Sequence, residues 1–472
     1  MIAQLPGPAP ARIGGRRVNR HRYQQDPIAY TSRLYHRYGP VAGLVRGDRQ
    51  QVFAFGAQHN RAVLLDADTF HTVLEYLTPE PIKRARRGIG LLEMNGPRHR
   101  RSRRMLAPAF HPRVLAGYRD DIVTMTDAQL STWRVGAQLD LVDQMRRLTL
   151  RIACRTLFGL DIADRSGRVG QLVADMLALP FFAPAVAWFP YDLPGTPYRS
   201  LLRTVRALDA ELQRMIDRRR AGAGGDLLGL LLALRDERGD PMPDDEIVGQ
   251  LNTLIVAGHE TSSNSLAWAL LLLAQHPDVL DALAAELAGT LGGAVPTVAD
   301  LERLPVLDAV VKETLRLLPP GPNTSRITTA ATELGGYSLA AGTVVVTSKY
   351  VTHRDPALYP EPSRFRPQRW LDGLTPNTVE YLPFGFGPHV CIGAVLARLE
   401  MRLILAMVVP RFRLAIGPGA TISRRVGLMM APRAGIPATV LGPERTPPAH
   451  PVRGNIHDMV DLGVGHWDRF GW

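Results

Sequence analysis

The longest run of helical periodicity in the chain extends from Asp244 to Gln275. Pro243 precedes it, acidic residues occupy its first turn, and Pro277 follows its end, which are start and stop signals of an α-helix. With a rise of about 1.5 Å per residue, this helix would be longer than about 40 Å and would cross a whole domain. We therefore expect a helix that is buried over much of its length.

Helical patterns dominate the chain from about Arg98 to Leu318. Within and beyond this region, amphipathic spacing and proline punctuation predict further helices at 278–291, 305–318 and 394–409. One stretch, Pro180–Pro197, interrupts the pattern with five prolines and five aromatic residues, so it cannot form a regular helix. It is either a packed connecting loop or an apolar flap over a route into the protein.

Strand patterns are short and lie outside the long helical region. Val41–Arg46 and Gln51–Phe55 flank a Gly-Asp turn and predict a β-hairpin. Residues 335–350 alternate as strand, turn and strand around Gly342. Residues 352–383 follow no regular period, and irregular segments of that length inside a compact domain are usually functional. The last thirty residues, 443–472, are rich in Pro and Gly, so we predict a flexible tail after a folded region of residues 1–442.

Composition places the chain among soluble, intracellular proteins. Of its 472 residues 46% are hydrophobic, yet the longest uninterrupted apolar run, Leu266–Ala274, is far shorter than the ~20 residues that span a bilayer. The first thirty residues contain no apolar segment of the kind expected for a signal peptide or membrane anchor. Two cysteines provide no disulfide framework or zinc-ligand spacing. We therefore expect a cytoplasmic protein without a transmembrane segment.

The formal net charge of +12 comes mostly from arginine. Nucleic-acid binding is one explanation, but the basic residues are scattered and no aromatic–basic alternation accompanies them. A basic surface for an acidic partner protein, or a generally arginine-rich composition, explains the charge as well. We expect no nucleic acid among the partners, and binding to mixed DNA with a steep salt dependence would contradict this.

The most informative short segment is FGFGPHVCIG, residues 384–393, which carries one of the two cysteines. Cys391 stands at the edge of a predicted helix, where free N–H groups and the helix dipole favour a thiolate, and the glycines let the backbone approach a large flat group. A catalytic nucleophile would need a neighbouring base, which the local sequence does not supply. One sulfur cannot hold zinc or an iron–sulfur cluster, but it can hold a haem iron. Cys154, on a helical stretch, is expected to be a small buried hydrophobe.

This segment resembles the haem-binding loop of the cytochrome P-450 family, the haem-thiolate monooxygenases. Phe384, Gly387, His389, Cys391 and Gly393 match the five fixed positions of the family's pattern. Four further blocks occur in the family's order, and the resemblance spans about Leu5 to Gly442. These blocks are HRRSR with His99 and Arg103, AGHET at Ala257–Thr261, KETLR with Glu313 and Arg316, and FRPQRW with Arg369.

The resemblance implies a role for each matching residue in binding haem b. Cys391 would be the axial ligand and the only metal ligand from the protein. His99, Arg103, Arg326 and His389 would surround the haem propionates, which need cationic or hydrogen-bond donors in a low-dielectric site. The remaining residues that the resemblance places against the haem are Phe384, Gly385, Gly393, Ala257 and Gly258.

The AGHET segment would form the oxygen-binding side of the site. A zinc-protease HExxH motif is excluded, because Ser263 stands where the second histidine would be. The resemblance implies that Thr261 hydrogen-bonds dioxygen and that Glu260 relays protons from solvent, and proton delivery permits cleavage of the O–O bond. A mid-helix threonine is also expected to bond back to a backbone carbonyl and bend the helix. For Glu260 the alternative is a salt-bridged structural acid.

Glu313, Arg316 and Arg369 would form a buried ion network, because the family places these three positions together. Buried charges must be paired. We interpret this network as structural support behind the cysteine loop and not as part of the chemistry.

The implied fold is mainly α, a single large domain of the cytochrome P-450 fold with small β-sheets near the N-terminus and toward the C-terminus, over residues 1–442. The implied activity inserts one oxygen atom from O₂ into a C–H bond or an alkene of an apolar molecule, either fatty-acyl or terpenoid. Electrons would come from separate proteins, a ferredoxin with its reductase or a flavodoxin. The alternatives are a haem-thiolate isomerase or dehydratase that does not use O₂, and a non-catalytic haem protein. Thr261, which relatives of the first kind typically lack, argues against the first alternative. The intact proton-relay pair of Glu260 and Thr261 has no obvious use in the second.

The walls of the substrate site are expected from five segments. They are the stretch after His71, the aromatic flap, the long helix, Pro320–Ser325 and Gly427–Met430. Their content of Leu, Met, Phe and Pro favours an apolar substrate.

Overall fold

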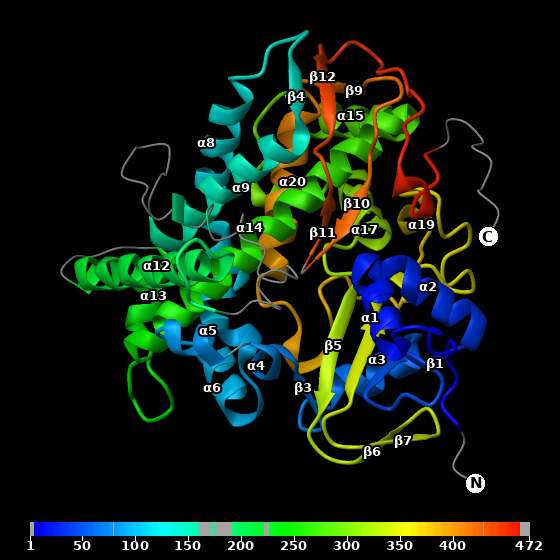
Figure 1. The fold of residues 1–472 in the computed structure, drawn as a ribbon. Coiled ribbons are helices and arrows are strands. Elements are labelled where there is room, and N and C mark those ends of the chain that lie inside the picture. The colour runs from blue at the N-terminus through cyan, green and yellow to red at the C-terminus, as the bar shows by residue number, and fades with distance from the viewer. Residues whose placement is uncertain are drawn as a thin grey trace.

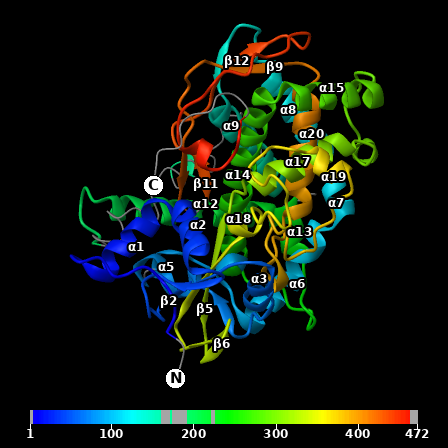
Figure 2. The same ribbon diagram turned by 90° about the vertical axis from the view of Figure 1, so that its right-hand side faces the viewer.

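The structure is a computed structural model, and it describes residues 4–78, 80–159, 171–172, 175, 191–220, 226–427 and 429–462. A large helical body adjoins a smaller region of strands and N-terminal helices (Figures 1 and 2). The fold is mainly α with small sheets, as the sequence predicted. The helices of the described residues are α1 (Gly15–Gln25), α2 (Pro27–Tyr38), α3 (Ala57–Leu65), α4 (Leu74–Leu77), α5 (Glu80–Ala85), α6 (Gly96–Leu106), α7 (Pro112–Ala116), α8 (Arg119–Leu130), α9 (Leu141–Phe158), α12 (Pro197–Arg220), α13 (Leu227–Ala233), α14 (Asp244–Gln275), α15 (Pro277–Leu291), α16 (Val298–Leu301), α17 (Pro305–Leu317), α18 (Lys349–Thr352), α19 (Gln368–Leu371) and α20 (Ala394–Val408).

Short 3₁₀ helices and strands complete the described elements. The 3₁₀ helices are η1 (Leu91–Glu93), η2 (Ala107–Phe110), η3 (Gly387–His389) and η4 (Asn455–Asp458). The strands are β1 (Val41–Gly43), β2 (Gln51–Ala54), β3 (Phe70–Thr72), β4 (Gln138–Asp140), β5 (Asn323–Thr328), β6 (Thr332–Leu334), β7 (Tyr337–Leu339), β8 (Val344–Ser348), β9 (Arg413–Ile416), β10 (Arg424–Val426), β11 (Met430–Pro432) and β12 (Pro437–Leu441).

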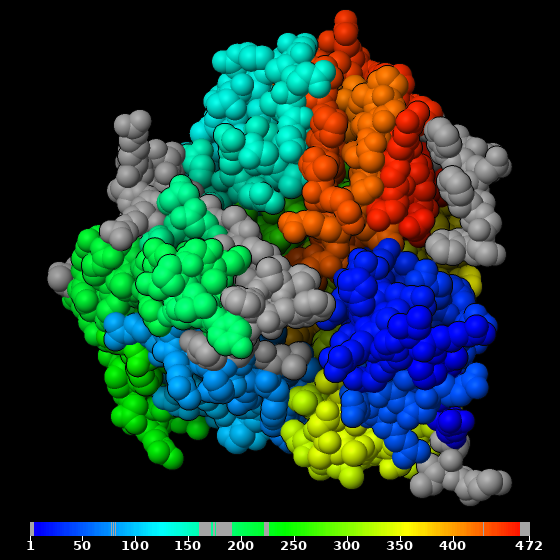
Figure 3. Space-filling model, viewed as in Figure 1, coloured from blue at the N-terminus to red at the C-terminus, as the bar shows by residue number. Residues whose placement is uncertain are grey.

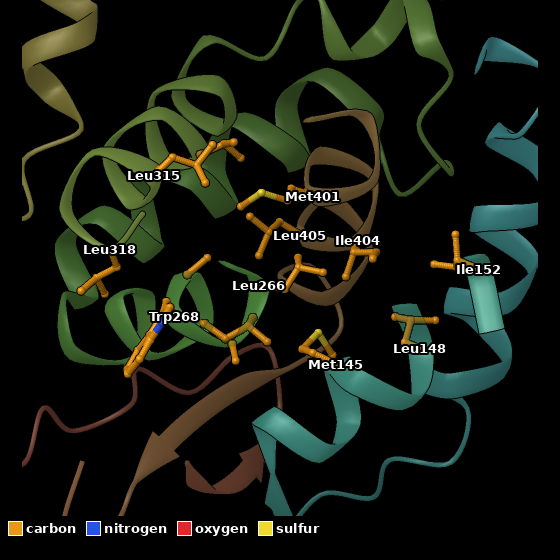
Figure 4. Close-up of a cluster of buried hydrophobic side chains, with 14 of the residues drawn as sticks. Met145, Leu148, Ile152, Leu266, Trp268, Leu315, Leu318, Met401, Ile404 and Leu405 are labelled. Atoms are coloured by element: carbon orange, nitrogen blue, oxygen red, sulfur yellow. The ribbon is translucent and has the colours of Figure 1, made fainter. Parts of the chain in front are cut away.

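Helix α14 runs through the helical body with the bounds that the sequence predicted. It packs against α9, α17 and α20 (Figure 1). Every residue from Ser262 to Gln275 is buried, which explains why the run Leu266–Ala274 within it is apolar on all sides of the helix. Side chains from the four helices interlock in one core that includes Met145, Trp268, Leu315 and Leu405 (Figure 4).

The largest sheet has the strand order β1-β2-β8-β5-β3 and brings distant segments together. The predicted hairpin of β1 and β2 is confirmed, with Val41 opposite Ala54 in antiparallel register. Strand β8 then pairs in parallel with β2 and antiparallel with β5, so that Arg326 lies opposite Val345. Both strands predicted within residues 335–350 are present, but they do not pair with each other. Strand β7 pairs with β6, whereas β8 joins the large sheet.

The prediction of a flexible tail differs from the structure over residues 443–462. Val452, Ile456, Met459, Val460 and Leu462 are at most 2% exposed and belong to the main core. The segment is irregular apart from η4, so its burial follows no helical or strand period that the sequence could have revealed. The segment also pairs with the chain that precedes it, since Ile422 N–H donates to Arg453 O at 2.7 Å. Figure 3 shows its red atoms packed against the orange surface of the preceding strands.

Among the described residues, no single helix is both long and apolar enough to span a bilayer. Helices α14 and α15 pass that test of length and composition only as a pair, and the chain bends by 107° between them.

Candidate active site

The Cys391 loop connects the irregular segment before it to α20. Gly385 and Gly387 have φ angles of 78° and 74°, in the left-handed region that favours glycine. A side chain on Gly387 would also collide with Leu64 O, at 2.2 Å, so the loop lies directly on the end of α3. Cys391 N–H donates to Phe384 O at 2.9 Å and closes the loop. The first residue of α20 follows three positions later, as the sequence predicted.

Cys391 keeps accessible surface although protein surrounds it. Burial raises the pKa of its thiol, while the Gly393 N–H, Lys349 and Arg103 favour the thiolate. A group that is both accessible and desolvated faces the interior of the molecule rather than its outer surface. A cation such as iron would complete the stabilisation of the thiolate.

The four residues predicted around the propionates come together beside Cys391. The rings of His99 and His389 stack with their centroids 3.9 Å apart. Burial, followed by the charges of Arg103 and Arg326, lowers the pKa of His99 to about 4. Burial, then Arg326, His99 and Arg103, lowers the pKa of His389 to about 3. Both imidazoles are therefore neutral at neutral pH and carry one N–H each.

Among the described residues, this cluster contains cations and neutral imidazoles but no carboxylate. The Nε2 atoms of His99 and His389 are buried without a hydrogen-bond partner. Burial lowers the pKa of Arg326 to about 10, and its Nη1 donates to the carbonyl of its neighbour, Ser325, at 3.1 Å. A buried cluster of this kind requires an anion, because unpaired buried charges and donors are costly. The two carboxylates of a haem fit this donor set, and the thiol of Cys391 fits its iron.

The AGHET segment lies on α14 where burial decreases. Ala257, Glu260 and Thr261 are half-buried and Gly258 is exposed, whereas the following residues are fully buried. Thr261 Oγ1 donates to Ala257 O at 2.6 Å, the back-bond that the sequence predicted. Glu260 forms no ion pair with a described residue. His259 points elsewhere, to Thr149 Oγ1 at 3.2 Å, and joins α14 to α9.

The predicted ion network is assembled around Glu313, which is 0% exposed. Arg316 donates to both carboxylate oxygens from Nε and Nη2, each at 2.9 Å, and Arg369 Nε donates to Oε1 at 3.0 Å. Trp370 Nε1, which the sequence analysis did not include, donates to Oε2 at 3.0 Å. Burial opposes ionisation, but Arg316 and Arg369 hold the pKa of Glu313 below its usual value.

His353 connects this network to the cysteine loop. Arg316 Nη1 donates to His353 O at 2.8 Å, and His353 Nε2 accepts from Leu382 N–H at 3.0 Å. Leu382 lies two residues before Phe384, where the loop begins. The network therefore fixes the backbone that leads into Cys391, and the signal in the sequence is only that His353 lies in the long irregular segment.

Two of the predicted wall segments meet. Met430 N–H donates to Pro320 O at 2.7 Å, so Met430 lies against the turn before β5. Most of the aromatic flap, residues 180–190, lies outside the described part of the chain.

Two further residues were missed from the sequence. Lys349, at the end of β8, is 9% exposed and lies close enough to Cys391 and Arg326 for their charges to act on it. Glu400 on α20 is 6% exposed, and burial raises its pKa to about 7 while a hydrogen bond from Ser262 opposes this. The only sign of Lys349 and Glu400 in the sequence is that each is a charged residue within a largely apolar stretch.

Two other arginines of helix α6 are not part of the cluster around His99 and His389. Arg101 is half-buried and pairs with Asp236 at 3.0 Å and Glu246 at 3.6 Å. Arg104 is exposed and pairs with exposed Glu237.

Comparisons with known proteins agree with this geometry. A model of the family "Cytochrome P450" matches residues 5–435. The cyclooctat-9-en-7-ol 5-monooxygenase of Streptomyces melanosporofaciens is 39% identical over 349 residues, 71% of this chain and 74% of that protein. Cyclooctatin synthase of the same organism is 37% identical over 74% of this chain and 79% of its own length. The solved structure of retinoic acid-bound cyanobacterial CYP120A1 superposes with a TM-score of 0.82 at 27% identity, covering 93% of this chain and 99% of that one.

Proposed function

The chain belongs to the cytochrome P450 family, whose members are haem-thiolate enzymes that use O₂, and we propose that it hydroxylates a terpenoid. The observation that carries this proposal is the similarity, at 39% and 37% identity, to two proteins of cyclooctatin chemistry, one of them named as a terpenoid-alcohol monooxygenase. The retinoic acid bound to the structural relative is also an isoprenoid. Fatty-acyl substrates, which the apolar walls also allow, become the second choice.

Haem b, when bound, supplies the binding of O₂ and the one-electron chemistry that the protein itself lacks. Cys391 would hold the iron, and His99, Arg103, Arg326 and His389 would hold the propionates. Phe384, Gly385 and Gly393 of the loop, with Ala257 and Gly258 of α14, would face the haem. The buried, unpartnered Nε2 atoms of His99 and His389 support the propionate assignment, and the accessible thiol supports Cys391 as the ligand. The residues that would face the haem are assigned from the family resemblance.

Thr261 and Glu260 of α14 would deliver protons at the oxygen-binding side of the site. The hydroxyl proton of Thr261 is committed to Ala257 O, so Oγ1 is left with lone pairs that accept a hydrogen bond. Thr261 therefore positions a protonated donor, such as water, and Glu260 replenishes it from solvent. Hydroxylation consumes O₂, two protons and two electrons and releases water, so each turnover needs proton delivery at this place.

The electrons would come from a separate ferredoxin with its reductase, or from a flavodoxin. The finer expectation of a cytoplasmic location also remains a prediction.

The test supplies purified holoprotein with a surrogate ferredoxin, its reductase and ¹⁸O₂. Substrates are cyclooctat-9-en-7-ol, other terpenoid alcohols and a fatty-acid series, screened first by the shift in iron spin state. We expect one ¹⁸O atom in a terpenoid product. Product formed without reductant or without label would instead identify the isomerase or dehydratase alternative, and label only in fatty acids would overturn the terpenoid assignment.

A further inference from the structure

Lys349 is a buried ammonium with no acid to neutralise it. It is one of only three lysines in a chain with 56 basic residues. It begins α18 directly after β8 and is 9% exposed. No Asp or Glu of the described residues pairs with it, whereas Lys83 and Lys312, the other two lysines, pair with Glu80 and Asp308. Burial of an unpaired charge is unfavourable, so this position calls for an anion, and no carboxylate of the described residues provides it.

The surroundings of Lys349 locate that anion. Ser348, its neighbour, lies opposite Asn323 in the sheet, and Tyr350 N–H donates to Pro322 O at 3.2 Å. A methyl group on Gly321 would lie 3.5 Å from Lys349 Nζ, so the side chain reaches toward the turn that precedes β5. That turn is the segment that Met430 also contacts. Lys349 thus belongs to the meeting place of two segments predicted to line the substrate site.

The charges around Lys349 have the same sign, apart from the thiolate. Burial lowers the pKa of Lys349 to about 8, the Cys391 thiolate opposes this shift, and Arg326 reinforces it. Lys349 in turn favours ionisation of Cys391. The ammonium therefore lies near Arg326 and Cys391 as well as against the turn before β5.

We propose that Lys349 binds a carboxylate in this region, either a propionate of the haem or the acid group of a substrate. The inference deepens the proposed function, on which it rests for the presence of haem and substrate. A carboxylate suits a single ammonium because Lys acts as a compact point charge with three donors. Both sources offer a carboxylate. Loss of the lysine charge would weaken haem binding if the carboxylate is a propionate, and substrate binding if it belongs to the substrate.

The first arm of the test measures haem retention. The rate of haem transfer from the ferric protein to excess apomyoglobin, and the reduction potential, are compared among wild type, Lys349→Met and Lys349→Arg. If the carboxylate is a propionate, Lys349→Met should release haem about tenfold faster than wild type, because it removes a charge-assisted hydrogen bond. Lys349→Arg keeps the charge and the donors, so its haem release should be close to that of wild type. Lys312→Met, at a half-exposed ion pair, is the matched control.

The second arm measures ligand preference. Spin-state titrations compare retinoic acid with its methyl ester, and palmitic acid with its methyl ester. If the carboxylate belongs to the substrate, wild type should bind an acid about tenfold more tightly than its ester, and Lys349→Met should lose this preference with haem transfer unchanged.

A change in either arm that the Lys312→Met control does not share supports the proposal and names the source of the carboxylate. Unchanged haem transfer together with unchanged acid preference overturns it, and where neither acid nor ester binds, haem transfer alone decides. None of these readouts needs O₂ or turnover, so a failure of the monooxygenase proposal would be seen separately.

Discussion

Thr261 and Ser265 are two hydroxyl residues one turn apart on α14, and their surroundings differ. It is half-buried and bonds back to Ala257 O, while Ser265, one turn later, is buried and bonds back to Thr261 O at 2.9 Å. Both side chains satisfy the helix in the same way. Only Thr261 has accessible surface on the side where the proposed proton delivery takes place.

The change Thr261→Ala should therefore uncouple electron consumption from product formation. Removal of an acceptor that positions a proton donor should lower product formed per electron pair by on the order of 100-fold. The measurement is product against NADPH consumed and peroxide released, with Ser265→Ala as the matched control. Equal coupling in Thr261→Ala and wild type would contradict the role given to this hydroxyl.

Glu400 makes a prediction about pH. Burial raises its pKa from 4.5 to about 7, and no charged group of the described residues is among the causes. The unfolded chain therefore loses this proton at lower pH than the folded chain, so this carboxyl destabilises the fold progressively from about pH 4.5 to about pH 7 and uniformly above. The full effect is on the order of 3 kcal/mol.

Glu400→Gln should remove this loss, because an amide does not ionise. Its stability advantage over wild type, taken from urea midpoints of the holoprotein, should grow from pH 5 to pH 7 and then level off. An advantage that does not vary with pH would show that Glu400 is not titrating in the folded protein.

At the scale of elements, the Glu313 network joins α17 to the irregular segment that carries Arg369 and Trp370. Five donors reach one buried carboxylate, including Arg366 N–H at 3.1 Å. The network and His353 fix the chain before the cysteine loop, so we expect the site to depend on a residue that does not touch it.

Glu313→Gln should destabilise the protein by about 3 kcal/mol, because it leaves two buried guanidiniums without a counter-ion. The matched control is Glu361→Gln, whose partners Arg364 and Arg366 are exposed at the surface. Urea midpoints and haem content measure both variants. A stable, haem-replete Glu313→Gln variant would contradict the structural role of the network.

Helix boundaries and charge pairs within one helix could be predicted from the sequence, because their signals are local. Pro243 and Pro277 bound α14, and the spacing of Glu313 and Arg316 places both on one face. The parallel pairing of β2 with β8 could not, because it joins segments almost three hundred residues apart. Lys349 was missed for the same reason: its burial depends on β5, Gly321 and the cysteine loop, none of which adjoins it in sequence.

At the scale of the whole molecule, the C-terminal segment completes the core. Residues 452–462 cover the irregular segment through contacts such as Arg354 Nη2 to Met459 O at 2.6 Å and Asp461 N–H to Ser363 O at 2.8 Å. Arg424 ties the same segment to the N-terminal helices, pairing with Asp458 at 3.2 Å and with Asp26 at 2.8 Å. Both ends of the chain thereby support the region that holds the site.

Ile456→Ala tests whether this segment belongs to the fold. Ile456 is 0% exposed, so truncation should cost about 2–4 kcal/mol from lost burial and the resulting cavity. Thr446→Ala, at an exposed position of the same segment, should stay within about 0.5 kcal/mol of wild type. Equal unfolding midpoints for the two variants would show that residues 443–462 do not contribute to the folded core.

We expect Cys391 to bind the haem iron as a thiolate, and the absorption spectrum of the reduced, carbon monoxide-treated protein reports that ligand. The wild type should show the red-shifted Soret band of thiolate coordination, Cys391→Ser should lose it, and Cys154→Ser should keep it. A wild-type spectrum without that band, or a Cys391→Ser spectrum that retains it, would show that Cys391 is not the iron ligand.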